Sequence, residues 1–163
     1  MTEYHMRYAD RALSETNAWD IFETAEYCVA STVDADGMPY GVPISFVVMN
    51  NQLYFHTTNT YGHKLDNFQH DARICVTAVV DVEACFEDDF MTSRYGSAMA
   101  FGRIRRVENS VEVRHALVAL CMKYLPNYKH EIGNAISKDL AETAVWAVEV
   151  ETITGKAARR LRK

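Results

Sequence analysis

The sequence predicts a mainly β fold in which six antiparallel strands close into a small barrel with flanking helices. Two observations predict it. β-Branched, apolar runs recur along the chain, and tight turns link most of them, so consecutive strands should pair antiparallel. Six such strands bury their apolar faces most economically by closing. A barrel this narrow is filled by its own side chains, so a ligand has to bind on its rim or between subunits.

The first part of the chain carries helix and then strand signals. Ser14 is a good N-cap, and a helix with one apolar face is expected to begin near it. Three strands follow, at residues 27–33, 38–49 and 52–57. Gly37 in the first turn is free to adopt a positive φ. Pro39 and Pro43 remove ladder donors, so the second strand is expected to be irregular or at an edge near its start.

The remaining elements are three strands and two helices. We expect helices at residues 62–70 and 110–124 and strands at residues 73–82, 96–107 and 143–153. Pro126 ends the second of these helices. The segment 83–94, which contains three consecutive acids, is expected to be a loop. Without repeats or a linker, residues 1–163 form a single domain, with an N-terminal helical segment (1–26) and a basic tail (157–163).

Composition excludes several classes of protein. The 163 residues are 48% hydrophobic and 24% charged, which is typical of a globular domain. A net charge of −5 argues against non-specific nucleic-acid binding. No apolar run approaches the roughly 20 residues of a membrane span, and the N-terminus is too polar for a signal peptide. We therefore expect a cytoplasmic protein that binds neither nucleic acid nor membrane. The four cysteines lack C-x-x-C spacing, which favours free thiols and no metal site.

The stretch from Leu53 to Asn67 predicts an anion site. A strand-like run ends in the hydroxyls of Thr57 and Thr58, and a helix carrying His63 and Lys64 begins after Gly62. Hydroxyl donors, unpaired helix N–H groups and a cation within one turn of each other suit a phosphate.

Local chemistry alone also allows structural roles for these residues. Thr57 and Thr58 could cap a turn, and His63 could be an ordinary surface histidine. His63 and His70 share a helix face, but two histidines without a nearby cysteine make a poor metal site. Trp146, flanked by apolar residues, is interpreted as core or interface packing.

Several segments together resemble a known family. They are residues 30–40, 42–46, 53–57, 62–67, 93–97, 101–103 and 154–156. In this order they resemble the pyridoxamine 5′-phosphate oxidase-like, FMN-binding split-barrel superfamily, and within it the branch of nitroimidazole-resistance proteins. The resemblance spans residues 7 to 156.

The resemblance implies a split β-barrel homodimer that binds FMN at two symmetric subunit interfaces. Thr57, His63 and Lys64 would contact the flavin phosphate, and residues 42–45 would lie along the isoalloxazine ring. Residues 95–97 would approach from another strand, across the dimer. The implied cofactor-binding residues are Val42, Pro43, Ile44, Ser45, His56, Thr57, Thr58, His63, Lys64, Tyr95, Gly96, Ser97 and Lys156.

The resemblance also implies a reaction class. The first reading is an FMN-dependent reductase of small electron-poor substrates such as nitroimidazoles, with NAD(P)H or another donor reducing the flavin. His63 and Tyr95 are the candidate catalytic residues. The alternatives are a non-catalytic flavin- or haem-binding module and an oxidase of pyridoxamine 5′-phosphate. The oxidase is disfavoured because the chain is short and its tail is only faintly Arg-rich.

Overall fold

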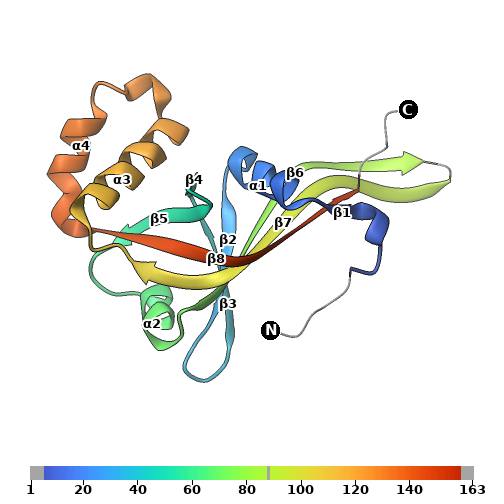
Figure 1. Cartoon of the computed structure of the whole chain (residues 1–163), viewed down its shortest axis with the longest axis horizontal. Helices are drawn as coiled ribbons and strands as arrows, with labels where there is room; N and C mark the ends of the chain where they lie inside the picture. The colour runs from blue at the N-terminus through green and yellow to red at the C-terminus, as the bar shows by residue number, and fades with distance from the viewer. Residues whose placement is uncertain (1–5, 88, 159–163) are drawn as a thin grey trace.

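One antiparallel sheet of eight strands runs through the computed structural model, which describes residues 6–87 and 89–158 (Figure 1). Its strands are β1 (Ala12–Leu13), β2 (Cys28–Val33), β3 (Pro39–Ile44), β4 (Val47–Met49), β5 (Gln52–Thr58), β6 (Arg73–Glu87), β7 (Phe90–Arg106) and β8 (Thr143–Ala158). The hydrogen-bonded order is β3-β2-β6-β7-β8-β5-β4, and β1 pairs with β8. The mainly β prediction is confirmed, with eight strands in place of six.

The two extra strands have local causes. β1 has only two residues, too few for a sequence signal. The strand expected over 38–49 divides into β3 and β4 because the backbone of Phe46 bonds to a helix and not to a neighbouring strand. Its N–H donates to the Tyr124 hydroxyl at 3.0 Å, and that hydroxyl lies 2.6 Å from the Glu26 carbonyl oxygen, to which it donates.

The sheet curls without closing. β3 and β4 follow one another in the chain but form its two opposite edges. The expectation of a closed barrel, which rested on economy of burial, is therefore corrected: the curled, open sheet fits a split barrel. The break at Phe46 leaves the two edges without a ladder between them.

Four helices pack on the sheet: α1 (Glu15–Thr24), α2 (His63–His70), α3 (Ser110–Tyr124) and α4 (Ile132–Asp139). Three short 3₁₀ turns accompany them, η1 (Ala9–Arg11), η2 (Pro126–Tyr128) and η3 (Leu140–Glu142). Ser14 caps α1 by accepting from the Asn17 N–H at 3.2 Å, as predicted. α4 was not predicted, since its eight residues include Gly133 and lack a side-chain cap.

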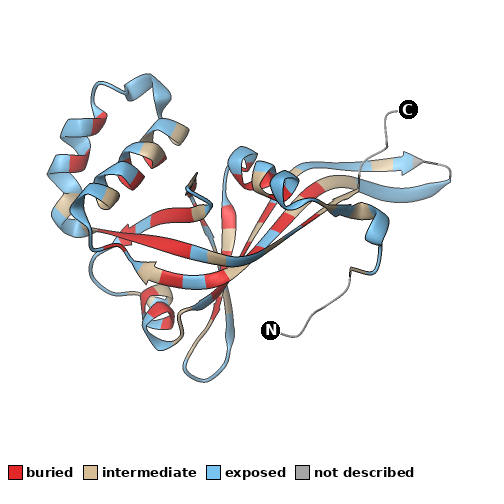
Figure 2. Cartoon of the chain, viewed as in Figure 1, coloured by how far each residue is buried: buried red, intermediate tan, exposed pale blue. Residues whose placement is uncertain are grey.

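The helices bury two separate cores, one on each face of the sheet. One core joins α1 and α2 to the sheet, and the other joins α3 and α4 to it. Alternate residues of β8 serve the two cores: Trp146 and Val148 enter the first, and Val145 and Ala147 the second. Figure 2 shows the middle of β5 and the first part of β8 as continuously buried. Trp146 packs 5.0 Å from Phe68, centroid to centroid, which confirms its interpretation as a packing residue.

The segment 83–94 is not a loop. It is the outer part of the β6–β7 hairpin, with ladder pairs from Glu83–Arg94 to Glu87–Phe90. A bulge between Val80 and Glu83 separates it from the inner ladder, and Asp81 there has a φ of +54°. The loop prediction rested on the acidic run at residues 87–89, which lies at the turn of the hairpin; the residues on either side of it pair as strands.

Gly102 provides a test of the sheet. A Cβ on this residue would lie 2.0 Å from the Glu149 carbonyl oxygen, whereas one on Gly133 would meet nothing within 4 Å. We expect Gly102→Ala to lower the free energy of unfolding by about 3 kcal/mol or more, because backbone atoms must move. Gly133→Ala, the matched control, should raise it by up to about 1 kcal/mol. Urea unfolding measures both, and equal effects would contradict the close β7–β8 approach.

Candidate functional site

The start of α2 is fixed between two strands. Gly62 has a φ of +154°, a conformation that L side chains rarely adopt, and its carbonyl accepts from the N–H groups of Leu65 and Asp66. The ring of His63 lies 4.2 Å from that of Tyr40 on β3, centroid to centroid. Further along the helix, the Asn67 amide donates to the Thr32 hydroxyl of β2 at 3.0 Å in the buried interior. The first turn of α2 is therefore held rigidly.

Lys64 lies close enough to His56 for its positive charge to affect the pKa of the imidazole. His56 lies on the outward side of β5, and partial desolvation and then the Lys64 charge lower its pKa. A pKa below the ordinary value keeps the imidazole neutral at neutral pH. Lys64 is therefore the residue that supplies fixed positive charge beside a neutral imidazole. We name His56, Thr57, Thr58, His63 and Lys64 the α2 group.

One member of the α2 group points the other way. Thr57 is only 4% exposed. Its hydroxyl donates to the Thr58 carbonyl at 2.8 Å and accepts from the Trp146 indole N–H at 3.0 Å. Strand alternation puts His56 and Thr58 on the opposite side, where both are exposed. The expected contact of the Thr57 hydroxyl with a phosphate does not fit this geometry, and Thr58 is the hydroxyl that faces outward.

The predicted ring-binding residues 42–45 lie at an edge of the sheet. β3 pairs with β2 only, so its other side presents backbone groups that no strand of the described chain satisfies. Pro43 and Ser45 are exposed, Val42 is half-buried and Ile44 is buried. An edge strand of this kind can exchange hydrogen bonds with a planar heterocycle.

The remaining predicted residues gather elsewhere, and we name Tyr95, Gly96, Ser97 and Lys156 the β8-end group. Ser97 lies opposite Lys156 in the ladder, and its hydroxyl donates to the Lys156 carbonyl at 3.4 Å. The Lys156 ammonium lies 6.0 Å from the Tyr95 ring centroid and 5.9 Å from that of Tyr8. Tyr8 escaped the sequence analysis because it lies outside any motif.

The α2 group and the β8-end group lie at opposite ends of β8. Thr57 pairs with Ala144, and Ser97 pairs with Lys156, twelve residues further along the strand. At about 3.3 Å per residue this is roughly 40 Å along β8, which crosses much of the molecule in Figure 1. One small ligand cannot touch both groups of a single chain.

A pocket borders the α2 group. A pocket of about 280 Å³ lies beside Thr58, between Phe68, Trp146 and Arg106. The Arg106 guanidinium donates to the side-chain oxygen of Asn59. The sequence analysis did not select Arg106; its only signal was its place at the polar end of a predicted strand. A second pocket, of about 440 Å³, lies between α1 and the β6 bulge and is also lined by Leu13 and Ala157; its lining includes no residue of the β8-end group.

The described part of the chain offers no cluster of three His, Cys, Asp or Glu residues that could hold a metal ion. No helix within residues 6–87 and 89–158 is long and apolar enough to cross a bilayer. All four cysteines are free thiols. Burial raises the pKa of the Cys28 thiol to about 12, so this cysteine stays a thiol and does not act as a nucleophile.

The proximity of Lys64 to His56 is testable without a ligand. Lys64→Ala removes a like charge, so the pKa of His56 should rise toward its ordinary value. Lys138→Ala, a change on the distant helix α4, should leave it unchanged. NMR titration of the imidazole resonance, assigned with His56→Gln, measures both. An unaltered His56 titration in Lys64→Ala would contradict the geometry.

Comparisons with known proteins place this geometry in a family. The family model for pyridoxamine 5′-phosphate oxidase matches residues 14–157, while no curated protein matches the sequence. A proposed 5-nitroimidazole antibiotic resistance protein from Bacteroides thetaiotaomicron has a TM-score of 0.75 and 23% identity, over 95% of this chain and 96% of that one.

Two further solved structures share the fold. The flavocytochrome Anf3 from Azotobacter vinelandii has a TM-score of 0.81 at 16% identity, over 96% of this chain and 73% of its own. A FAD and haem binding protein from Mycobacterium smegmatis has a TM-score of 0.76 at 22% identity, over 90% and 72%. The family match includes the α2 group, the β3 edge and the β8-end group, and confirms the resemblance seen in the sequence. The chain belongs to the pyridoxamine 5′-phosphate oxidase family.

Proposed function

We propose that this protein binds FMN with its phosphate at the start of α2 and acts as an FMN-dependent reductase of small electron-poor substrates such as nitroimidazoles. The observation that carries the proposal is that the first turn of α2 carries both His63, which lies against Tyr40, and Lys64, whose charge acts on His56, a short way after the exposed Thr58 at the end of β5. The names of the structural neighbours, a proposed nitroimidazole resistance protein and two flavin proteins, support the cofactor class.

The first turn of α2 has the donors that a phosphate monoester needs. Leu65 and Asp66 direct their N–H groups to the Gly62 carbonyl, so the amides of His63 and Lys64 are the donors left for a ligand. Lys64 adds a full positive charge and Thr58 an outward hydroxyl. Stacking on Tyr40 orients the His63 ring. The dianion therefore meets donors that are already positioned.

The isoalloxazine ring is assigned to the free edge of β3. Residues 42–45 offer backbone groups there. Pro43 has no backbone N–H, so it offers its carbonyl alone. The β8-end group, roughly 40 Å away along β8 in the same chain, contacts the ring from a second copy. Each FMN then lies between two subunits, and a homodimer holds two.

FMN, when bound, would supply the redox chemistry between an NAD(P)H donor and the substrate. The chain's own residues bind and orient it. Neutral His56 can donate a proton only when ligand charge raises its pKa, and a phosphate dianion near Lys64 acts in that direction. Tyr95, on the ring side, is the stronger of the two candidate catalytic residues, because His63 lies at the phosphate end of the proposed site.

A spectroscopic experiment separates this function from its alternatives. The purified protein with FMN is reduced anaerobically by NADH and then mixed with a nitroimidazole. Reoxidation by the nitroimidazole supports the reductase. Reoxidation by oxygen alone favours a non-catalytic flavin module, a Soret band on purification favours haem, and peroxide release with pyridoxamine 5′-phosphate favours the oxidase.

Lys64→Ala should raise the dissociation constant for FMN at least tenfold, equal to about 1.4 kcal/mol, because the phosphate loses its cation. Lys138→Ala keeps the same net charge change on the exposed face of α4 and should bind FMN as the wild type does. Fluorescence titration measures both. Equal affinity in Lys64→Ala and wild type would remove Lys64 from the site.

Mixed dimers test whether two copies share each site. In a dimer of one Lys64→Ala chain and one Lys156→Ala chain, sites shared between subunits leave one site with both lysines and one with neither. Half of the sites should then bind with wild-type affinity. A site built within one chain cannot contact both Lys64 and Lys156, so in that arrangement the Lys156→Ala homodimer would bind FMN with wild-type affinity. Shared sites instead predict weaker binding by both homodimers and recovery of half of the sites only in the mixed dimer. Mixing Lys64→Ala with Lys138→Ala is the control for exchange, since half its sites are intact in either arrangement.

A further inference from the structure

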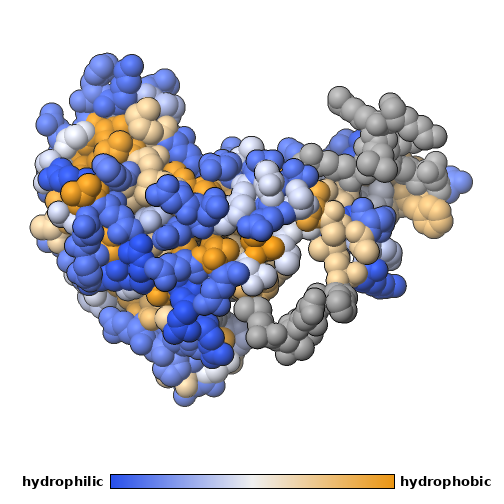
Figure 3. Space-filling model, in the orientation of Figure 1, coloured by the Kyte–Doolittle hydropathy of each residue, from blue (hydrophilic) through white to orange (hydrophobic). Residues whose placement is uncertain are grey.

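The last turn of α3 is tied to the segment that joins β3 to β4. The helix packs on the sheet mainly through apolar side chains, and apolar surface borders it in the space-filling view (Figure 3). Its last two residues, Lys123 and Tyr124, differ because each directs a polar group at Phe46. The end of α3 therefore holds this segment through specific polar contacts as well as through packing.

The Tyr124 hydroxyl contacts three parts of the chain. The Phe46 N–H donates to it at 3.0 Å, and the Phe46 carbonyl oxygen lies 3.1 Å from it. The hydroxyl itself donates to the Glu26 carbonyl, just before β2, at 2.6 Å. Burial raises the pKa of the phenol, while hydrogen bonds with the Phe46 backbone and the Ser45 side chain act to lower it. A single hydroxyl therefore fixes Ser45 and Phe46 relative to the start of β2.

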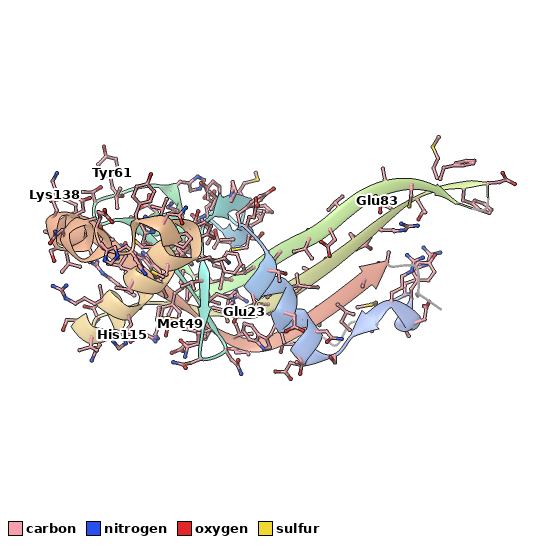
Figure 4. The ribbon with its side chains drawn as sticks, turned by 90° about the horizontal axis from the view of Figure 1, so that it is seen from above. Glu23, Met49, Tyr61, Glu83, His115 and Lys138 are labelled. Carbon is pink, nitrogen blue, oxygen red and sulfur yellow. The ribbon has the colours of Figure 1, made fainter. Side chains whose placement is uncertain are left out.

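The Phe46 side chain fixes the same segment from inside the protein. It is fully buried, and the Lys123 ammonium lies 3.9 Å from the centroid of its ring, which allows a cation–π attraction. β4 begins at the next residue and contacts both α1 and α3; Figure 4 shows Met49 of this strand between Glu23 of α1 and His115 of α3. The segment cannot shift without disturbing a buried ring.

The segment held in this way adjoins the edge that we assign to the isoalloxazine ring. The β2–β3 ladder ends at the pair of Ile44 with Cys28, so Ser45 lies beyond it, and no ladder in the described part of the chain fixes the Ser45 backbone. Ser45 is nevertheless one of the residues of the proposed ring edge, and it is exposed. Groups that bind a ligand must be held in place by their surroundings, and for Ser45 the Tyr124 hydroxyl provides that support.

We propose, on the basis of the proposed function, that Tyr124 is a positioning residue for the isoalloxazine ring. Its hydroxyl holds Ser45 and Phe46 where the β3 edge meets the ring, and it acts on the ring end of the cofactor alone, since the α2 group binds the phosphate end. Without the hydroxyl, the buried Phe46 N–H loses its partner. An unpaired buried donor is costly, so the segment shifts to satisfy it and carries Ser45 away from the ring.

The test uses two probes that share the ring and differ in the phosphate. Riboflavin lacks the phosphate, so Tyr124→Phe should raise the dissociation constants of riboflavin and FMN by the same factor, about tenfold, whereas Lys64→Ala should weaken FMN more than riboflavin. The matched control is Tyr54→Phe, which removes a hydroxyl that also ties α3 to the sheet, through Glu112 at 2.8 Å. Fluorescence titration measures the affinities, and circular dichroism checks that each variant keeps the fold.

The absorption spectrum of the bound flavin gives a second readout. A displaced ring edge changes the surroundings of the isoalloxazine, so the visible bands of FMN bound to Tyr124→Phe should shift relative to the wild type. Those of FMN bound to Tyr54→Phe should not. A general loss of stability would change the fraction of folded protein and leave the bands of the bound flavin in place.

The outcomes separate the role of Tyr124 from the proposed function. Parallel losses of riboflavin and FMN affinity in Tyr124→Phe, with shifted bands and an unaffected Tyr54→Phe, support the role. Wild-type affinity for both flavins in Tyr124→Phe overturns it and leaves the proposed function intact. A loss confined to FMN, or equal losses in Tyr124→Phe and Tyr54→Phe, overturns it as well. A wild type that binds neither flavin refutes the proposed function, and the role of Tyr124 with it.

Discussion

Strand β8 pairs with β5 through its first residues and with β7 along most of its length, and its side chains alternate between two cores. Every helix packs on one of the faces that this alternation creates. Trp146 connects β8 to two other elements. Its ring packs on Phe68 of α2, and its indole N–H donates to the Thr57 hydroxyl of β5. A buried indole N–H without that partner would carry an uncompensated desolvation cost.

The same ladder decides what the candidate site can be. Because Thr57 faces Trp146, its neighbours His56 and Thr58 face outward. Because β8 is long, the α2 group and the β8-end group are held apart within one chain. A site that used both groups would therefore need residues from two chains.

The α2 group offers the kinds of groups that bind a phosphate. A helix start pinned by Tyr40 and Asn67 presents amides and one lysine, a combination that selects for phosphate charge within a chain whose net charge is negative. In the function that we propose, these groups bind the phosphate tail of the cofactor, and the choice of substrate is left to residues around the ring.

Local signals in the sequence determined the elements and the family. Ser14 predicted the start of α1, the helix over residues 110–124 was predicted with its observed bounds, and the order of short motifs identified the family that residues 14–157 match. Such signals act within a few residues, where capping, turn geometry and periodicity are set. Contacts between distant residues decided the rest. Tyr124 breaks a strand at Phe46, 78 positions away, Trp146 turns Thr57 inward from 89 positions away, and the β6–β7 ladder overrides an acidic, loop-like segment. No local pattern records these partners, because their energy arises only when the sheet brings them together.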